Sequence, residues 1–187
     1  CAKKDNGTTI ITHPNMKYFE NKLDVEQLQN YLRVKSALLK GVEVSFQKGE
    51  EEPIIWHYES LKEYLISESN KINQETYWAT TQTIEENQPN QTDFIWDFEY
   101  YLENESSLGK KGEGLHVVLG FLEEGRRVTE SFVNLIPTLN GGTHERGLKN
   151  GLFEGLINFM NHYNLMPKIN LEADDLWQKT SYVLSSK

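Results

Sequence analysis

The sequence predicts an α+β fold, a sheet with one long helix packed on it, and three observations support this prediction. Residues 131–160 read as a buried strand, a Gly-Gly turn and a long helix with apolar residues at helical spacing. Aromatic and aliphatic side chains occupy every second position over 94–102, which places them on one face of a strand. Other short apolar runs lie between turn-forming stretches. Such strands bury one face by packing against a helix.

In the first third of the chain, β-branched and alternating residues indicate strands, and a leucine stripe indicates a helix. Leu28, Leu32 and Leu39 recur at helical spacing, and Gly41 suits the end of that helix. Pro14 ends the first β-branched run, because proline donates no backbone hydrogen bond. The predicted elements are a strand at 7–14, a helix at 18–40, strands at 42–46 and 54–58, and a short helix near 61–65.

The rest of the chain predicts a meander followed by the long helix. Residues 68–90 are polar and rich in Asn, Gln, Thr and Glu, so we expect them to be the least structured part. Pro137 ends the strand that precedes the Gly-Gly turn. The predicted elements are strands at 94–102, 115–122 and 128–136 that form a three-stranded meander, the long helix after 142, a short helix at 173–180 and a strand at 182–185.

Three glycines share one face of the predicted long helix. Gly147, Gly151 and Gly155 recur every four residues. Inside a helix each glycine costs about 0.5–1 kcal/mol relative to alanine. We expect another backbone to pack closely against this face, because close packing would explain the cost. The alternative is a helix that simply tolerates three glycines.

Composition and charge limit the possible functions. The 187 residues are 37% hydrophobic and 25% charged, which fits one domain with an appended piece, and no apolar run is long enough for a membrane span. The formal net charge of −9 argues against a surface that grips DNA mainly through its own cations. A single cysteine excludes an internal disulfide and fits a reducing cytoplasm. Because the chain starts with Cys1, we expect a fragment of a longer protein.

No residue pattern predicts a catalytic or metal site. The five histidines lack metal-ligand spacing, and no CxxC, HExxH or P-loop pattern occurs. His144 has no carboxylate or nucleophile at a recognisable spacing, so we expect it to satisfy a helix N-terminus or to pack at a domain boundary. Asn140 and Thr143 are the expected helix caps.

The stretch VNLIPTLNGGTHERGLKNGL, residues 133–152, resembles the signature of the transducer domain in the B subunits of bacterial type IIA topoisomerases. Its most distinctive positions are Asn134, Gly141, Gly142, Thr143 and His144. The pattern is more similar to the topoisomerase IV type than to the gyrase type, which remains the alternative. The resemblance implies a ribosomal protein S5 domain 2-like transducer over 58–187, a mixed sheet with helices on one face, with an atypical insertion near 85–114.

The first residues resemble the last strand of the ATP-binding domain in the GHKL ATPase family. This resemblance assigns 1–57 to the C-terminal part of that domain. It places Gly7 and Thr8 on the adenine floor, where the threonine hydroxyl would act through a bound water. It also implies that the general base, the magnesium ligand and the glycine-rich lid lie upstream, and that the phosphate-contacting glutamine and lysine lie downstream. We therefore expect this chain alone to hold no cofactor and to be inactive.

By resemblance, the full-length parent is the ATPase subunit of a type IIA DNA topoisomerase that uses ATP and Mg²⁺. It would couple ATP binding and hydrolysis to DNA strand passage, and so relax and decatenate chromosomes in the cytoplasm. Its implied partners are DNA, the topoisomerase IV A subunit (ParC) in an A2B2 heterotetramer, and a second B subunit that dimerises with it on ATP binding. No membrane is expected to take part.

Two questions stay open at this point. The alternative of another class is a non-enzymatic S5-like module that binds RNA or protein, which the charge of −9 and the Gly7-Thr8 pair disfavour. The aromatic strand within the 85–114 insertion could pack in a hairpin or form an exposed contact surface.

Overall fold

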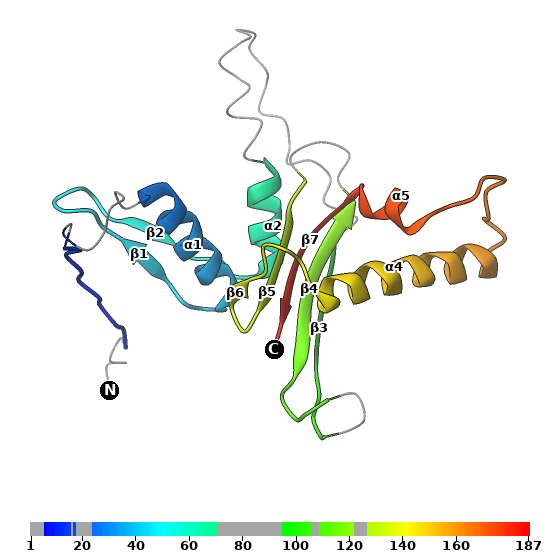
Figure 1. Ribbon diagram of the computed structural model, residues 1–187, viewed down its shortest axis with the longest axis horizontal. Helices are drawn as coiled ribbons and strands as arrows, with labels where there is room; N and C mark the ends of the chain where they lie inside the picture. Colours follow the sequence, from blue (N-terminus) through cyan, green and yellow to red (C-terminus); the bar gives the residue numbers. More distant parts are fainter. Residues whose placement is uncertain (1–5, 16, 18–23, 71–94, 106–108, 122–126) are drawn as a thin grey trace, which may run out of the picture.

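The computed structural model describes residues 6–15, 17, 24–70, 95–105, 109–121 and 127–187. The small sheet pairs β1 (Val44–Phe46) with β2 (Ile54–Trp56). The large sheet contains β3 (Ile95–Tyr101), β4 (Gly114–Phe121), β5 (Thr129–Val133), β6 (Ile136–Pro137) and β7 (Thr180–Ser186). The helices are α1 (Val25–Leu38), α2 (Leu61–Asn70), α4 (Thr143–His162) and α5 (Ala173–Trp177) (Figure 1).

The large sheet has the strand order β3-β4-β7-β5-β6, so its last strand in sequence lies in the middle. β7 runs antiparallel to β4, with Val183 opposite Val118, and parallel to β5, with Ser185 beside Phe132. The sheet is mixed, as the resemblance implies. The predicted three-stranded meander is wrong, because β7 inserts between β4 and β5. Local patterns did not reveal this, since the strands that pair with β7 are distant in sequence.

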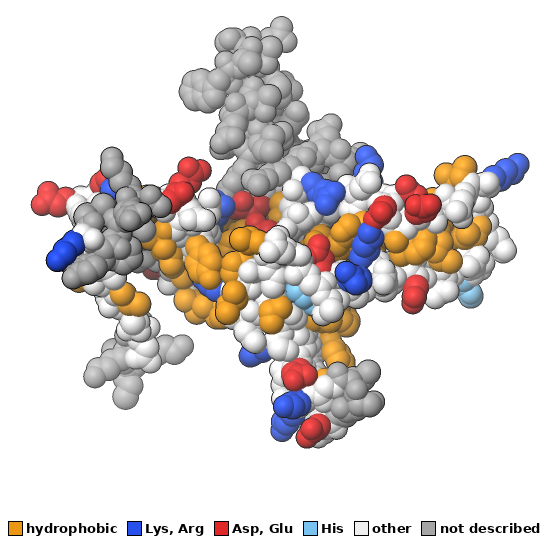
Figure 2. Space-filling view, in the orientation of Figure 1, with side chains coloured by type: hydrophobic (Ala, Val, Ile, Leu, Met, Phe, Trp, Pro, Cys, Tyr) orange, Lys and Arg blue, Asp and Glu red, His pale blue; other side chains and the backbone are white. Residues whose placement is uncertain are grey.

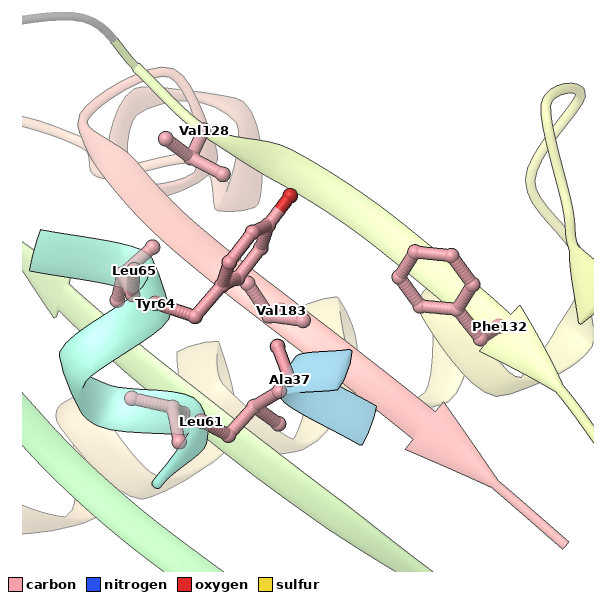
Figure 3. Close-up of a cluster of buried hydrophobic side chains, with 8 residues drawn as sticks. Ala37, Leu61, Tyr64, Leu65, Val128, Phe132 and Val183 are labelled. Carbon is pink, nitrogen blue, oxygen red and sulfur yellow. The ribbon is translucent and has the colours of Figure 1, made fainter. Parts of the chain in front are cut away.

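Helices lie against both faces of the large sheet. One face carries a buried cluster (Figure 3) made of Ala37, Leu61, Tyr64, Leu65, Val118, Val128, Phe132 and Val183. The other face carries a second cluster made of Val117, Leu119, Tyr182 and Leu184, against which α4 and α5 pack. The α+β class is confirmed. The helices cover two faces instead of one because β4 and β7 are apolar on both sides.

α1 starts with a side-chain cap. Asp24 precedes the helix, and its Oδ1 accepts a hydrogen bond from the Gln27 N–H at 2.9 Å. Of the helix predicted at 18–40, residues 18–23 lie outside the described residues. The strands predicted at 42–46 and 54–58 appear as the β1–β2 hairpin.

A two-residue turn joins β5 to β6. Asn134 and Leu135 have φ values of 48° and 67°, the left-handed values that such a hairpin turn requires at both central positions. The continuous strand predicted at 128–136 is therefore wrong, because the chain reverses at Asn134. Asn134 suits such a turn, but leucine rarely adopts positive φ, so the usual glycine signal was missing at the second position.

The segment predicted as a strand at 7–14 has no regular structure. Ile10 and Ile11 are 81% and 79% exposed. An extended segment becomes a strand where a neighbour pairs with its backbone, and no described strand lies beside this one. β-propensity alone did not determine the outcome.

β3 forms one edge of the large sheet and exposes aromatic side chains. Trp96, Phe98 and Tyr100 are 52%, 55% and 48% exposed. Trp96 makes an edge contact with Phe121, with 5.9 Å between ring centroids. β3 thus pairs with β4 in a hairpin while its aromatic side chains stay about half exposed, so packing within a hairpin and an exposed contact surface both remain predictions. Parts of the 85–114 insertion, residues 85–94 and 106–108, lie outside the described residues, as do residues 71–90 of the polar stretch.

α4 projects away from the large sheet (Figure 1), and none of its residues is fully buried. A Cβ built on Gly147, Gly151 or Gly155 would meet no atom within 4 Å. The close backbone neighbour predicted for this glycine face is therefore wrong. The first half of α4 contacts the second cluster through Leu148 and Leu152. Among the described helices, α4 included, none has the length and apolar character of a membrane span.

Candidate functional site

The distinctive sequence positions occupy two turns, one before β6 and one between β6 and α4. Asn134 lies in the β5–β6 turn, and its N–H donates to the Ser186 carbonyl at 2.9 Å. Gly141 has φ 68°, Gly142 directly precedes α4, and α4 begins at Thr143. No hydrogen bond between described side chains joins Asn134 to the second turn.

His144, in the first turn of α4, belongs to a hydrogen-bond network with the hydroxyls of Thr138 and Ser131. Its Nε2 lies 3.2 Å from Thr138 Oγ1, which is 2.5 Å from Ser131 Oγ. The Thr138 N–H and hydroxyl also donate to the Ser131 carbonyl, at 2.8 and 2.9 Å. The network connects the start of α4 to β5. A structural role for His144 stays a prediction that this geometry supports.

The helix caps differ from those predicted. The residue at the N-cap is Gly142, and no side chain caps the helix there. Thr143 is already the first helical residue, so neither it nor Asn140 is the cap. The Gly142 carbonyl instead accepts the Arg146 N–H at 3.1 Å. A glycine is tolerated at this position because its small size leaves helix N–H groups accessible to other acceptors.

Glu145 connects α4 to the sheet, and sequence reasoning missed it. Its Oε1 accepts the Tyr182 hydroxyl at 2.6 Å, and its Oε2 accepts the Ser131 hydroxyl at 3.4 Å. A carboxylate in the first helical turn is also stabilised by the helix dipole, which was the available signal. Burial raises the pKa of Tyr182, and the hydrogen bond and negative charge of Glu145 raise it further.

The position of Glu145 explains the glycine at 141. A Cβ on Gly141 would lie 2.8 Å from Glu145 Oε2, and the positive φ disfavours any L side chain there. A larger residue at 141 would therefore be strained and would displace the Glu145 carboxylate. Asn134, by contrast, tolerates its φ of 48° because asparagine is among the residues enriched in that region.

A groove of about 990 Å³ lies between α1 and the part of the large sheet formed by β5 and β6. Leu28, Tyr31 and Val34 of α1 line one wall, and Phe132 and Pro137 line the other. Figure 2 shows hydrophobic side chains gathered over α1 and, elsewhere on the same face, along α4. The groove walls thus come from both segments that the sequence assigns to different domains, 1–57 and 58–187.

Direct contacts hold the two walls together. The Lys35 ammonium donates to the Leu135 carbonyl in the β5–β6 turn. Arg33 of α1 pairs with Glu68 of α2 at 3.1 Å, and Ala37 of α1 belongs to the buried cluster. α1 therefore contacts α2, and it reaches the large sheet through Lys35 and Ala37.

The predicted nucleotide contacts do not form a site among the described residues. Gly7 and Thr8 are exposed, and a Cβ on Gly7 would meet no atom within 4 Å. Neither residue lines the groove. No set of three or more His, Cys, Asp or Glu side chains in the described parts is arranged to hold a metal ion. The described residues therefore do not fit ATP or Mg²⁺, and the adenine-floor role of these two residues stays a prediction.

Comparisons with known proteins identify relatives over the whole chain. The family model for DNA gyrase B matches residues 59–187. The B subunit of DNA topoisomerase 4 from Haemophilus influenzae is 35% identical, and the Escherichia coli protein of the same name is 30% identical. Each alignment covers 100% of this chain but 27% of the relative. The chain thus spans about a quarter of the length of these curated relatives.

Solved structures show the same fold. The topoisomerase IV ATP-binding domain of Francisella tularensis aligns with a TM-score of 0.58 and 25% identity, over 93% of this chain and 41% of that one. The B subunit of DNA gyrase from Myxococcus xanthus aligns with a TM-score of 0.62 and 16% identity, over 98% of this chain and 48% of that one. The second likeness concerns the fold alone.

Proposed function

This chain belongs to the DNA gyrase B family, and from that premise we propose that it is part of the ATPase subunit of a topoisomerase IV-type enzyme. The parent would couple ATP binding and hydrolysis to the passage of one DNA duplex through another. Relaxation and decatenation of chromosomes in the cytoplasm would follow from that coupling. The described part of the chain would transmit the nucleotide state and perform no chemistry itself.

The observation that carries this proposal is the similarity to topoisomerase IV B subunits along the entire chain, at 35% and 30% identity in two species. A gyrase-type parent is the disfavoured alternative, because both of these relatives carry the topoisomerase IV name. Family membership also removes the support for an independent S5-like module that binds RNA or protein. The net charge of −9 agrees, since such a module would need a basic surface.

The geometry suits a transmitting role. α1 and the β1–β2 hairpin would belong to the ATP-binding part, 1–57, and the large sheet would form the transducer, 58–187. Ala37 packs in the sheet's buried cluster, and Lys35 contacts the β5–β6 turn, so a displacement of α1 would be passed to the sheet. Rigid-body rotation about such a packed boundary is a common way to transmit a ligand state.

The remaining assignments are proposals of the same kind. Gly7 and Thr8 would complete the adenine floor once the rest of the ATP-binding domain is present. ATP and Mg²⁺ would act in the full-length protein. A second B subunit would dimerise with it on ATP binding, and two A subunits (ParC) would complete the heterotetramer on DNA.

The test uses the full-length B subunit with its cognate A subunit. We expect ATP-dependent decatenation of linked DNA circles and relaxation of supercoils, without the introduction of negative supercoils. ATP-dependent negative supercoiling would identify the gyrase alternative instead. Absence of any ATP-dependent strand passage by the assembled, folded complex would refute the proposal. The chain of 187 residues, assayed alone for ATP hydrolysis, is expected to be inactive.

A further inference from the structure

We infer that Arg33, Glu68, Tyr64 and Glu130 form a buried polar latch that positions α1 on the large sheet and couples the two parts of the chain. The inference rests on the proposed function, because it names positioning residues through which the nucleotide-binding part would act on the transducer. The latch residues come from three elements, α1, α2 and β5.

The first half of the latch is a buried ion pair between α1 and α2. Arg33 Nη2 lies 3.1 Å from Glu68 Oε2, and the two side chains are 20% and 5% exposed. Among described side chains, this pair joins residues on opposite sides of the predicted boundary at 57 and 58. Arg33 lies one helical turn before Ala37, and Glu68 lies one helical turn after Leu65, so the pair borders the apolar core.

The second half connects α2 to the sheet. Tyr64 lies one helical turn before Glu68, and its hydroxyl donates to the two carboxylate oxygens of Glu130 at 2.9 and 3.2 Å. The Tyr64 side chain is completely buried. The Tyr58 ring packs edge-on against it, with 5.3 Å between centroids. Because Tyr64 and Glu68 lie on the same helix, a displacement of α1 would be passed through α2 to β5.

Stability does not explain why charged residues occupy these positions. Removing a charge from water costs about as much as a buried pair recovers, and apolar residues of similar volume are often equally stable there. Arg33 Nε is also buried and makes no hydrogen bond, so the guanidinium is incompletely satisfied. A charge pair, unlike an apolar one, is favourable in a single geometry. This property suits a contact that specifies one arrangement of two parts.

The test compares an apolar replacement of the latch with a matched exposed pair. The double variant Arg33→Met with Glu68→Leu removes both charges and keeps the volume. The control, His57→Gln with Glu59→Gln, removes a hydrogen bond at 3.1 Å that crosses the same boundary but whose side chains are 41% and 83% exposed. Both sets of changes are made in the full-length B subunit, which is then assembled with its cognate A subunit. The measured quantity is the number of ATP molecules hydrolysed per decatenation event.

If the latch couples the two parts of the chain, the double variant should uncouple ATP hydrolysis from decatenation and still fold. We expect the double variant to keep its melting temperature within a few degrees and to hydrolyse several times more ATP per decatenation event than the wild type does. The control should leave the ratio unchanged. An unchanged ratio in a folded double variant overturns the latch, because a merely structural pair would not affect coupling.

Two further outcomes are decisive. If the double variant melts much earlier, Arg33→Lys replaces it, which keeps the charge and loses the planar fork; a wild-type ratio in that folded variant also overturns the latch. If the wild-type complex shows no ATP-dependent strand passage, the proposed function fails and the latch fails with it. If the wild type and the folded latch variants hydrolyse the same number of ATP molecules per decatenation event, the latch is refuted and the proposed function stands.

Discussion

α2 and α4 lie against opposite faces of the same sheet and bury very different amounts of themselves. α2 has 10 residues, of which Leu61, Tyr64, Leu65, Glu68 and Ser69 are buried. α4 has 20 residues and buries none of them fully. Both helices have apolar residues at helical spacing. The comparison teaches that periodicity predicts a helix and its contact face, but not how completely that face is covered.

The largest expected effect is a core truncation on the α2 side. Leu65→Ala should reduce the free energy of unfolding by about 2–5 kcal/mol, because it leaves a cavity in a fully buried cluster. Leu156→Ala on α4 is the matched change and should cost less than about 1 kcal/mol, since its side chain is partly solvated. Urea titrations of both variants measure the difference. Equal costs would show that α4 is covered as fully as α2.

A second prediction tests whether α4 is fixed at its first turn. Gly141→Ala should destabilise by about 1–3 kcal/mol, because the residue has φ 68° and the new Cβ would lie 2.8 Å from Glu145 Oε2. Gly49→Ala is the control, since Gly49 has φ 61° with no atom within 4 Å of the added Cβ. The excess cost at 141 over 49 measures the clash alone. No excess would mean that Glu145 moves aside freely.

The two faces should respond alike to alkaline pH, because each buries one tyrosine hydroxyl beside a glutamate. Burial and the Glu130 charge raise the pKa of Tyr64 well above the ordinary tyrosine value near 10. The unfolded chain loses this proton near pH 10 while the folded chain keeps it, so the stability present below pH 10 is lost as the pH rises. The slope is about 1.4 kcal/mol per pH unit for one such tyrosine.

Removing the hydroxyl of Tyr64 or of Tyr182 tests this pH dependence of stability. In melting curves above pH 10, Tyr64→Phe and Tyr182→Phe should each weaken the pH dependence by a similar amount, because burial raises the pKa of both hydroxyls and the two residues are 0% and 2% exposed. An unchanged pH dependence in one variant would show that the folded state does not protect that hydroxyl from ionisation.

The smallest expected effect concerns the open glycine face. Gly151→Ala should stabilise the protein by about 0.5–1 kcal/mol, because alanine is the better helix former and no atom lies within 4 Å of the added Cβ. Gly155→Ala should behave in the same way. Thermal melts of the single variants provide the measurement, and a loss of stability at both positions would indicate a neighbour packed against this face.

Most of the secondary structure could be predicted from local patterns, but its assembly could not. The leucine stripe of α1 and the alternation of β3 gave the correct element types. The position of β7 between β4 and β5 depends on pairs such as Phe121 with Thr180, which local sequence does not encode. The turn at Asn134 and Leu135 lacked the usual glycine and was read as strand.

The candidate site was predicted in part. The Gly141-Gly142 turn and His144 were singled out from the resemblance, and the structure places them at the start of α4. Glu145 and Tyr182 were missed, because a hydrogen bond between residues 37 positions apart is set by the fold. The role of Thr8 remains a prediction, since no described element surrounds it.

The central place of β7 has a consequence for how the protein is made. Leu115 of β4 pairs with Ser186, and Thr129 of β5 pairs with Tyr182, so neither pairing can form until the ribosome has released the residues through β7. Before that moment the nascent chain holds β3–β4 and β5–β6 as separate ribbons, each too small to be stable alone and each with an open edge. Such late, long-range pairing is slow and leaves those edges available for aggregation. We expect this segment to depend on chaperones during synthesis, most of all while β7 is still inside the ribosomal tunnel.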